Sequence, residues 1–246
     1  MKISFVIPAY NEEAVIGMCL QSLQKELAHA TCEWEVVVVN NASTDRTKEI
    51  AQTFAAVRVV DEPTKGLVTA RKAGFIATTG ELVANIDSDV MLTEGWLKKV
   101  LSEFEKDKTL VALSGPFIYY DLSVFTRFFV KIFYGIGYIT HLLNHHVFHA
   151  GAMLQGGNFI IRRDAWNTAG GFDTTISFYG EDTDVAKRLS KIGKVKWTFS
   201  LPVYTSGRRL KAEGVIRMGL KYSINHMWIT WFGRPYTQTY VDIRPK

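Results

Sequence analysis

The sequence predicts an α/β fold in which a mostly parallel central sheet carries helices on both faces. Short apolar runs rich in β-branched residues alternate with stretches of helical periodicity over roughly the first 115 residues. Polar clusters follow the ends of several of these runs, where parallel sheets bind ligands. A chain of 246 residues with 47% hydrophobic and 22% charged residues is also large enough for one such domain with a full core.

The expected strands are short apolar runs that end in polar or turn residues. They are residues 3–7, Trp34 to Val39, Val57 to Val60, Leu82 to Ile86, and Leu110 to Leu113. The expected helices repeat apolar residues at helical spacing or begin at a capping sequence. They are Glu12 to Ala28, a helix that begins after Ser43-Thr44-Asp45, Leu67 to Thr78, and Trp96 to Phe104. Because a helix follows nearly every strand, the strands should run parallel.

The regular alternation stops near Phe117 and mixed structure resumes at residue 155. This divides one domain into residues 1–115, an amphipathic insertion at 116–154, and residues 155–246, which end in a helix from Ala212 to Phe232. The expected helix at residues 125–134 has an apolar face and a separate basic face. The apolar face holds Phe125, Phe128, Phe129, Ile132 and Phe133, and the basic face holds Arg127 and Lys131. Such a helix either packs on its own domain or lies in a membrane interface.

Charge and cysteine content narrow the class of partner. The net charge is +5, and residues 207–246 hold eight Lys or Arg against two acidic residues. A basic end suits phosphate groups or an anionic membrane surface, and no nucleic-acid module is readable, so no nucleic-acid partner is expected. With only Cys19 and Cys32 and no long apolar run, we expect a cytoplasmic protein without a transmembrane helix. Membrane binding by the insertion would make it peripheral on the inner membrane face.

Asp87 and Asp89 follow the run Leu82 to Ile86, where a buried strand ends. Two carboxylates one residue apart are costly unless a cation neutralises them, and Mg²⁺ leaves coordination positions open for substrate phosphates. Polar loops at Pro8 to Glu12 and Asn40 to Asp45 fall at the same edge of the predicted sheet. The three loops together predict a nucleotide-sized site with a divalent ion. A zinc site at the histidines of residues 141–149 is disfavoured, because no carboxylate or cysteine accompanies them.

Six ordered segments give the chain a specific resemblance. They are FVIPAYNEE at 5–13, VVNNASTDRT at 38–47, GLVTARKAG at 66–74, GELVANIDSDV at 80–90, GGNFIIRRDAW at 156–166 and GGFDTTISFYGEDTDVAKRL at 170–189. In this order they resemble the family-2 glycosyltransferases of the GT-A fold. The resemblance implies a Rossmann-like nucleotide-sugar-binding half at 1–115 and an acceptor-binding half at 155–246.

The resemblance also implies which residues bind the donor, a UDP- or GDP-sugar. Those of the nucleotide pocket are Pro8, Ala9, Tyr10, Glu12, Asn41, Arg71, Asp87 and Ser88. Asp89, with Asp87, would hold Mn²⁺ or Mg²⁺. Arg208 and Arg209, which follow the last expected strand, either clamp the diphosphate or belong to an ordinary basic loop. The family usually has an acid near Asn40 and Asn41. Asn both donates and accepts hydrogen bonds, so the identity of the base stays open.

On the acceptor side the resemblance implies Asp182 as general base beside Glu181, with Gly156, Gly157 and Asn158 in a neighbouring loop. One base without a covalent nucleophile implies inversion at the anomeric carbon. The acceptor would be a saccharide or a lipid-linked molecule in the synthesis of a cell-envelope polysaccharide or glycolipid. Two alternatives remain. One is transfer to a polyprenyl phosphate, which needs no base, and the other is a non-catalytic module that binds nucleotide sugars or membranes.

Overall fold

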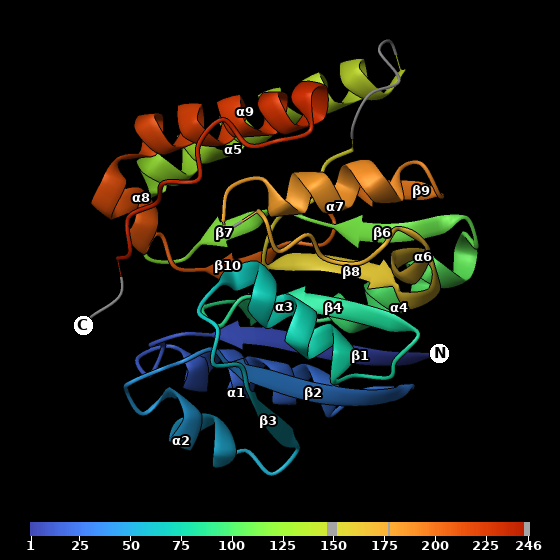
Figure 1. Ribbon diagram of the computed structural model, residues 1–246, viewed down its shortest axis with the longest axis vertical. Helices are drawn as coiled ribbons and strands as arrows, with labels where there is room; N and C mark the ends of the chain where they lie inside the picture. Colours follow the sequence, from blue (N-terminus) through green and yellow to red (C-terminus); the bar gives the residue numbers. More distant parts are fainter. Residues whose placement is uncertain (147–151, 177, 244–246) are drawn as a thin grey trace.

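A seven-stranded sheet forms the centre of the protein (Figure 1). The structure, a computed structural model, describes residues 1–146, 152–176 and 178–243, without the side chains of residues 140–146. The strand order is β3-β2-β1-β4-β8-β6-β9. The strands are β1 Lys2–Ala9, β2 Glu33–Asn40, β3 Val57–Asp61, β4 Leu82–Ile86, β6 Leu110–Ser114, β8 Asn158–Arg162 and β9 Lys194–Trp197. All neighbours are parallel except that β8 runs antiparallel to β4 and β6, so the mostly parallel sheet is confirmed.

Helices cover both faces of this sheet, as the sequence predicts. One face packs against α1 Ile16–Leu27, α2 Thr47–Gln52 and α4 Trp96–Lys106. The other packs against α3 Leu67–Ile76, α6 Arg163–Thr168 and α7 Glu181–Leu189. Strand β1 contributes side chains to the cores on both faces of the sheet, because successive side chains of a strand point to opposite faces. Phe5 and Ile7 enter the first core and Val6 enters the second.

A second, three-stranded sheet was not predicted. Its order is β5-β10-β7, with bounds Met91–Leu92, Val203–Thr205 and Phe117–Tyr119. Strands of two or three residues carry too little periodicity to be read from sequence. This small sheet matters because β5 follows Asp89 directly and β10 ends just before Arg208. It therefore brings a late segment of the chain to the loop after β4.

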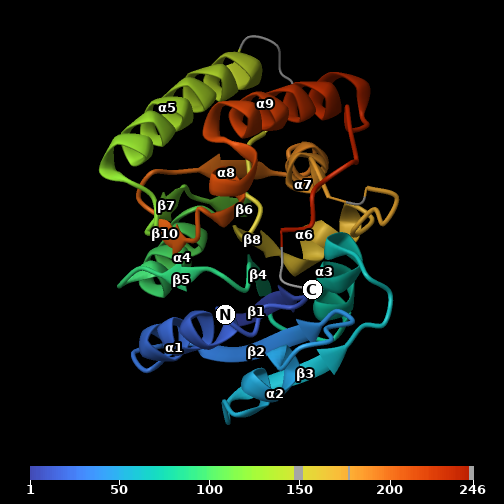
Figure 2. The same cartoon turned by 90° about the vertical axis from the view of Figure 1, so that its left-hand side faces the viewer.

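Helices α5 Val124–His146 and α9 Val215–Phe232 lie side by side at one end of the molecule, which Figures 1 and 2 show from two directions. A small core that includes Val130, Tyr134 and Met218 attaches them to the body. The C-terminal helix expected from Ala212 to Phe232 is confirmed in α9, but it begins three residues later than expected. The chain forms α8 Arg208–Glu213 and then α9, because Gly214, with φ of 86°, breaks the helix. No helix in the described part of the chain is long and apolar enough to cross a membrane.

Candidate active site

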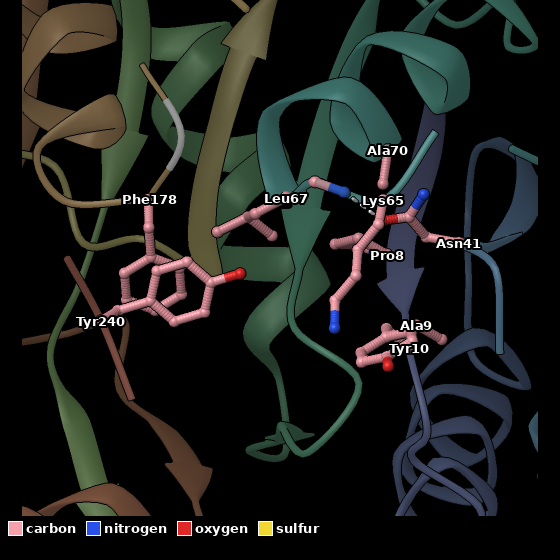
Figure 3. Close-up of a pocket in the computed structure, with 10 residues that line it drawn as sticks. Pro8, Ala9, Tyr10, Asn41, Lys65, Leu67, Ala70, Phe178 and Tyr240 are labelled. Atoms are coloured by element: carbon pink, nitrogen blue, oxygen red, sulfur yellow. Dashed lines mark hydrogen bonds between the residues drawn. The ribbon is translucent and has the colours of Figure 1, made fainter. Parts of the chain in front are cut away.

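A pocket at the carboxyl ends of β1 and β2 contains four of the predicted donor residues, Pro8, Ala9, Tyr10 and Asn41 (Figure 3). Six further residues of its lining were not predicted: Lys65, Gly66, Leu67, Ala70, Phe178 and Tyr240. The Lys65 ammonium lies 3.8 Å from the centre of the Tyr10 ring. Across the pocket, the Phe178 and Tyr240 rings stack with centroids 4.5 Å apart. A planar base would therefore meet aromatic side chains on both sides of this pocket.

Asn41 also lines the pocket, but most of its hydrogen-bonding capacity is used within the protein. Its amide nitrogen donates to the carbonyls of Glu62 and Thr64 at 3.0 and 2.8 Å, and its oxygen accepts from the Gly66 N–H at 2.8 Å. Both amide hydrogens are engaged, so Asn41 can only accept one more bond through its remaining lone pair. In this arrangement the side chain fixes the loop before α3, and toward a base it can act as an acceptor alone.

Glu12, Arg208 and Asp89 form one cluster next to this pocket. Arg208 donates to both carboxylate oxygens of the buried Glu12, at 2.7 and 2.6 Å, and its Nη2 is 3.3 Å from Asp89 Oδ2. Thr205 Oγ1 donates to the other Asp89 oxygen at 3.3 Å. The pKa of Asp89 is raised to about 7, chiefly by burial. The positive charge of Arg208 lowers this pKa, whereas the nearby carboxylates of Asp87 and Glu12 raise it further. Glu12, expected in the nucleotide pocket, and Arg208, expected to clamp the diphosphate, are thus paired with each other.

Arg71 occupies the centre of the site and links its two sides. Its guanidinium is fully buried on α3 and donates to Asp87 Oδ1 at 3.0 Å and to Glu181 Oε1. Burial raises the pKa of the Glu181 carboxyl, while the facing Arg71 acts in the opposite direction. The contact with Arg71 fixes the position of the Glu181 side chain. Glu181, predicted beside the base, is therefore placed as the partner of Arg71.

Asp182 lies at the N-terminus of α7 and faces the loop before β8. Its Oδ2 accepts from the Gly156 N–H at 2.9 Å, and its Oδ1 accepts from the Thr183 N–H at 2.8 Å. Gly157 has φ of 82°, and a Cβ atom there would lie 2.2 Å from Asp87 Oδ2. Only glycine allows the backbone to pass so close to that carboxylate. The Gly156-Gly157 loop thus connects the Asp87 side of the site to the Asp182 side.

Three predicted residues have other surroundings. Asn158 is fully buried at the start of β8, where its amide donates to the carbonyls of Gly115 and Leu201 and its oxygen accepts from the Trp96 indole. Its side chain is buried in the core and does not line the Gly156-Gly157 loop. Arg209 contacts Glu213, the Val241 carbonyl and the Phe178 ring. Ser88 is buried between the two aspartates.

The unpredicted pocket residues come from three distant segments. Lys65 precedes α3, Phe178 precedes α7, and Tyr240 lies in the segment after α9. That segment is held by an ion pair of 3.1 Å from Lys65 to Asp242 and by the bond from Arg209 to Val241. Of these residues, Lys65 had a signal in the sequence. It is basic and precedes Gly66, and a glycine at the start of a helix often adjoins a phosphate-binding site.

The carboxylates of Asp87 and Asp89 are suitable ligands for a divalent ion such as Mg²⁺ or Mn²⁺. No group of three or more His, Cys, Asp or Glu side chains able to hold a metal occurs among the described residues. Mg²⁺, however, is usually held by one or two carboxylates and by substrate phosphates. The donor set of Asp87 and Asp89 matches that mode. The zinc interpretation of residues 141–149 depends on side chains outside the described ones.

The fold and the site define a class of protein, and a comparison with known families assigns it. The family model described as "Glycosyl transferase family 2" matches residues 4–169. The chain therefore belongs to this family of glycosyltransferases, as its six sequence segments predict.

Individual relatives and solved structures agree with this assignment. A hyaluronan synthase from Pasteurella multocida is 28% identical over 253 residues, which cover 94% of this chain but only 24% of that protein. A mannosyltransferase from Pyrobaculum calidifontis, solved with GDP-Man and Mn²⁺, has a TM-score of 0.67 at 20% identity and covers 87% of this chain and 62% of that one. Glucosyl-3-phosphoglycerate synthase from Mycobacterium tuberculosis, solved with Mn²⁺, UDP and phosphoglyceric acid, has a TM-score of 0.63 at 19% identity. The match covers 92% of this chain and 77% of that one. These similarities show the GT-A fold, and the chain spans about a quarter of the hyaluronan synthase.

Proposed function

We propose that this chain transfers a sugar from a nucleoside-diphosphate donor to an acceptor hydroxyl, with inversion and with the help of a divalent ion. The observation that carries the proposal is the position of Asp182. The Gly156-Gly157 loop holds its carboxylate on one side and passes against Asp87 on the other. A candidate base and a candidate metal ligand thus adjoin the same two-residue loop, as a direct displacement requires.

In this mechanism Asp182 removes the proton from the acceptor hydroxyl. The resulting oxygen attacks the anomeric carbon, the bond from that carbon to the diphosphate breaks, and the proton remains on Asp182. A divalent ion bound at Asp87 and Asp89 would act as a Lewis acid that stabilises the charge on the leaving diphosphate. Arg208 lies against Asp89, so its guanidinium is close enough to contact the same phosphates. Glu181 keeps Arg71 in place and leaves the role of base to Asp182.

The donor base should stack in the pocket of Tyr10 and Tyr240 and donate an N–H to Asn41. Uracil and guanine both carry such an N–H, so UDP- and GDP-sugars both suit an acceptor there. The solved relatives that contain UDP or GDP-Man with Mn²⁺ support this donor class and this metal. Thermal-shift measurements with UDP-, GDP- and dTDP-sugars, with and without Mn²⁺, test it. Metal-dependent stabilisation by one of these donors is expected, and the absence of any stabilisation would refute the donor proposal.

The acceptor is proposed to be a saccharide or lipid-linked hydroxyl rather than a polyprenyl phosphate. A phosphate is already ionised and needs no base, whereas here a carboxylate is oriented by two N–H donors at the head of α7. Incorporation of labelled sugar into a hydroxyl acceptor and into a polyprenyl phosphate, measured in parallel, separates the two. If an Asp182→Asn variant transferred sugar to the polyprenyl phosphate at full rate, the result would favour the polyprenyl phosphate as acceptor.

A further inference from the structure

Helices α5 and α9 expose a joint apolar surface that faces away from the body of the protein. On α5 it comprises Phe125, Phe128, Phe129, Ile132, Phe133, Ile136 and Ile139, and on α9 Ile216, Leu220, Ile224, Met227, Trp228, Trp231 and Phe232. Exposure reaches 71% at Phe125 and 80% at Ile216. Single exposed apolar residues are ordinary, but a contiguous set on two adjacent helices marks an interaction site.

The geometry of the two helices makes this one surface. Val130 and Tyr134 of α5 and Met218 and Ile229 of α9 are buried toward the body, so the exposed residues occupy the opposite side of each helix. A Cβ atom at Gly219 would lie 3.3 Å from the Phe133 ring, which shows that the helices touch at this position. Figures 1 and 2 show both helices along the same end of the molecule.

The charges of these helices select the occupant. Neither α5 nor α9 contains an Asp or Glu, and each contains two basic residues: Arg127 and Lys131 on α5, and Arg217 and Lys221 on α9. Lys221 already pairs with Glu213 of α8 at 3.5 Å. Two copies joined through this face would bring Arg127, Lys131 and Arg217 together with no Asp or Glu on either helix to meet them, which disfavours a homodimer. An anionic lipid surface satisfies both features, because it accepts apolar side chains and attracts Lys and Arg. Trp228 and Tyr236, whose rings contact each other, are residues of the type that prefers the membrane interface.

We propose that the α5–α9 surface docks the protein onto an anionic lipid membrane, with both helices lying in the interface. The sequence suggested such a role for residues 125–134 alone, and the structure adds α9 as the second half. Helix α9 also packs on α7, where Lys187 donates to the Ile229 carbonyl at 3.0 Å and Thr183 lies 3.3 Å from His226 Nδ1. Docking would therefore hold the N-terminus of α7, which carries Asp182, close to the lipid surface. This proposal does not depend on the transfer chemistry.

Co-sedimentation of the full chain with vesicles, without donor or metal, tests the proposal. We expect binding to phosphatidylcholine vesicles that contain phosphatidylglycerol, weaker binding at high salt, and little binding to phosphatidylcholine alone. Phe128→Glu on α5 and Leu220→Glu on α9 should each weaken binding about tenfold, because each removes an apolar side chain that would enter the interface. Ile76→Glu, at a position on α3 that is 71% exposed, is the matched control and should bind as the unchanged protein does.

A second measurement requires no charge substitution. Lipids brominated in their acyl chains should quench the tryptophan fluorescence of the unchanged protein, and Trp228→Phe should reduce this quenching. Failure to bind anionic vesicles would overturn the proposal, as would equal losses for Phe128→Glu and Ile76→Glu. Light scattering that shows a dimer abolished by Leu220→Glu, without vesicle binding, would instead assign the face to a second copy.

Discussion

The carboxylates of the proposed donor side and Asp182, the proposed base, are held in different ways. On the donor side, Glu12 and Asp89 share the cation of Arg208, and Asp87 pairs with Arg71. On the acceptor side, Asp182 accepts hydrogen bonds from the neutral N–H groups of Gly156 and Thr183. Cations neutralise a cluster of acids, so the donor side can exchange one positive partner for another, such as a metal ion. Neutral donors only orient a carboxylate, which suits a group that must accept a proton.

The largest effect is expected for Asp182→Asn, which removes the proton acceptor and keeps the shape of the side chain. Turnover should fall about 10²–10⁴-fold, the usual contribution of a general base, while donor affinity measured by calorimetry stays unchanged. Asp184→Asn is the control on the same helix turn, where the carboxylate pairs with Arg188 at 2.6 Å. It should retain turnover. Full activity of Asp182→Asn would remove the functional distinction between the two sides.

Arg71→Met removes the cation that Asp87 and Glu181 share. Since Glu181 would remain buried without a partner, the free energy of unfolding measured in denaturant should fall by about 3–5 kcal/mol. Adding Glu181→Gln should recover part of this loss. Arg46→Met is the matched control, because the ion pair of Arg46 with Glu13 is exposed and its removal should cost at most about 1 kcal/mol. A similar loss for both variants would contradict the central role given to Arg71.

Gly157→Ala and Gly170→Ala form a matched pair. Both positions have positive φ, 82° and 89°, so both variants should lose about 1–2 kcal/mol of stability. At Gly170 nothing lies within 4 Å of the added carbon, whereas at Gly157 it meets Asp87. Gly157→Ala should therefore lose about 1–3 kcal/mol more and weaken Mn²⁺-dependent donor binding, measured by calorimetry. Equal donor affinity in the two variants would show that the close contact with Asp87 is not needed.

The smallest effect concerns a carboxylate outside the site, Glu35 on β2. Burial by itself would raise the pKa of Glu35, but hydrogen bonds from Thr79 and Ser4 and the charge of Lys2 outweigh it and lower that pKa to about 2. A depressed pKa stabilises the fold at high pH, so Glu35→Gln should cost about 1 kcal/mol at pH 7, after solvent screening. Unfolding measured between pH 7 and pH 2 should show this difference shrink below about pH 4.5 and vanish near pH 2. A difference that grows with acidity would contradict stabilisation of the ionised Glu35 by the hydrogen bonds from Thr79 and Ser4.

The strands and helices of the first half could be predicted because each carries its own periodicity. Leu82 to Ile86 and the helix beginning at Trp96 lie where the sequence places them. The small sheet could not be predicted, because β5 has two residues and its pairing with β10 joins segments more than a hundred residues apart. The same long-range pairing brings Arg208 to Glu12 and Asp89, a contact with no local signal.

The roles of single residues were likewise predictable only where they depend on local sequence. The resemblance implies Asn158 for the acceptor-side loop, yet Asn158 is fully buried at the start of β8, and its amide donates to the carbonyls of Gly115 and Leu201. Phe178 and Tyr240 could not be chosen for the donor pocket, since 62 residues separate them along the chain and only the fold stacks their rings.

By itself, the sequence determined the family, the strand-helix alternation, and the loops that supply Asp87, Asp89 and Asp182, because local periodicity and short motifs carry that information. The tertiary structure decided which charges meet. It paired Arg71 with Glu181 and Arg208 with Glu12, and it set α9 beside α5 to form one apolar face. Ion pairs and exposed surfaces depend on distances between segments remote in the chain, and only the packed fold sets those distances.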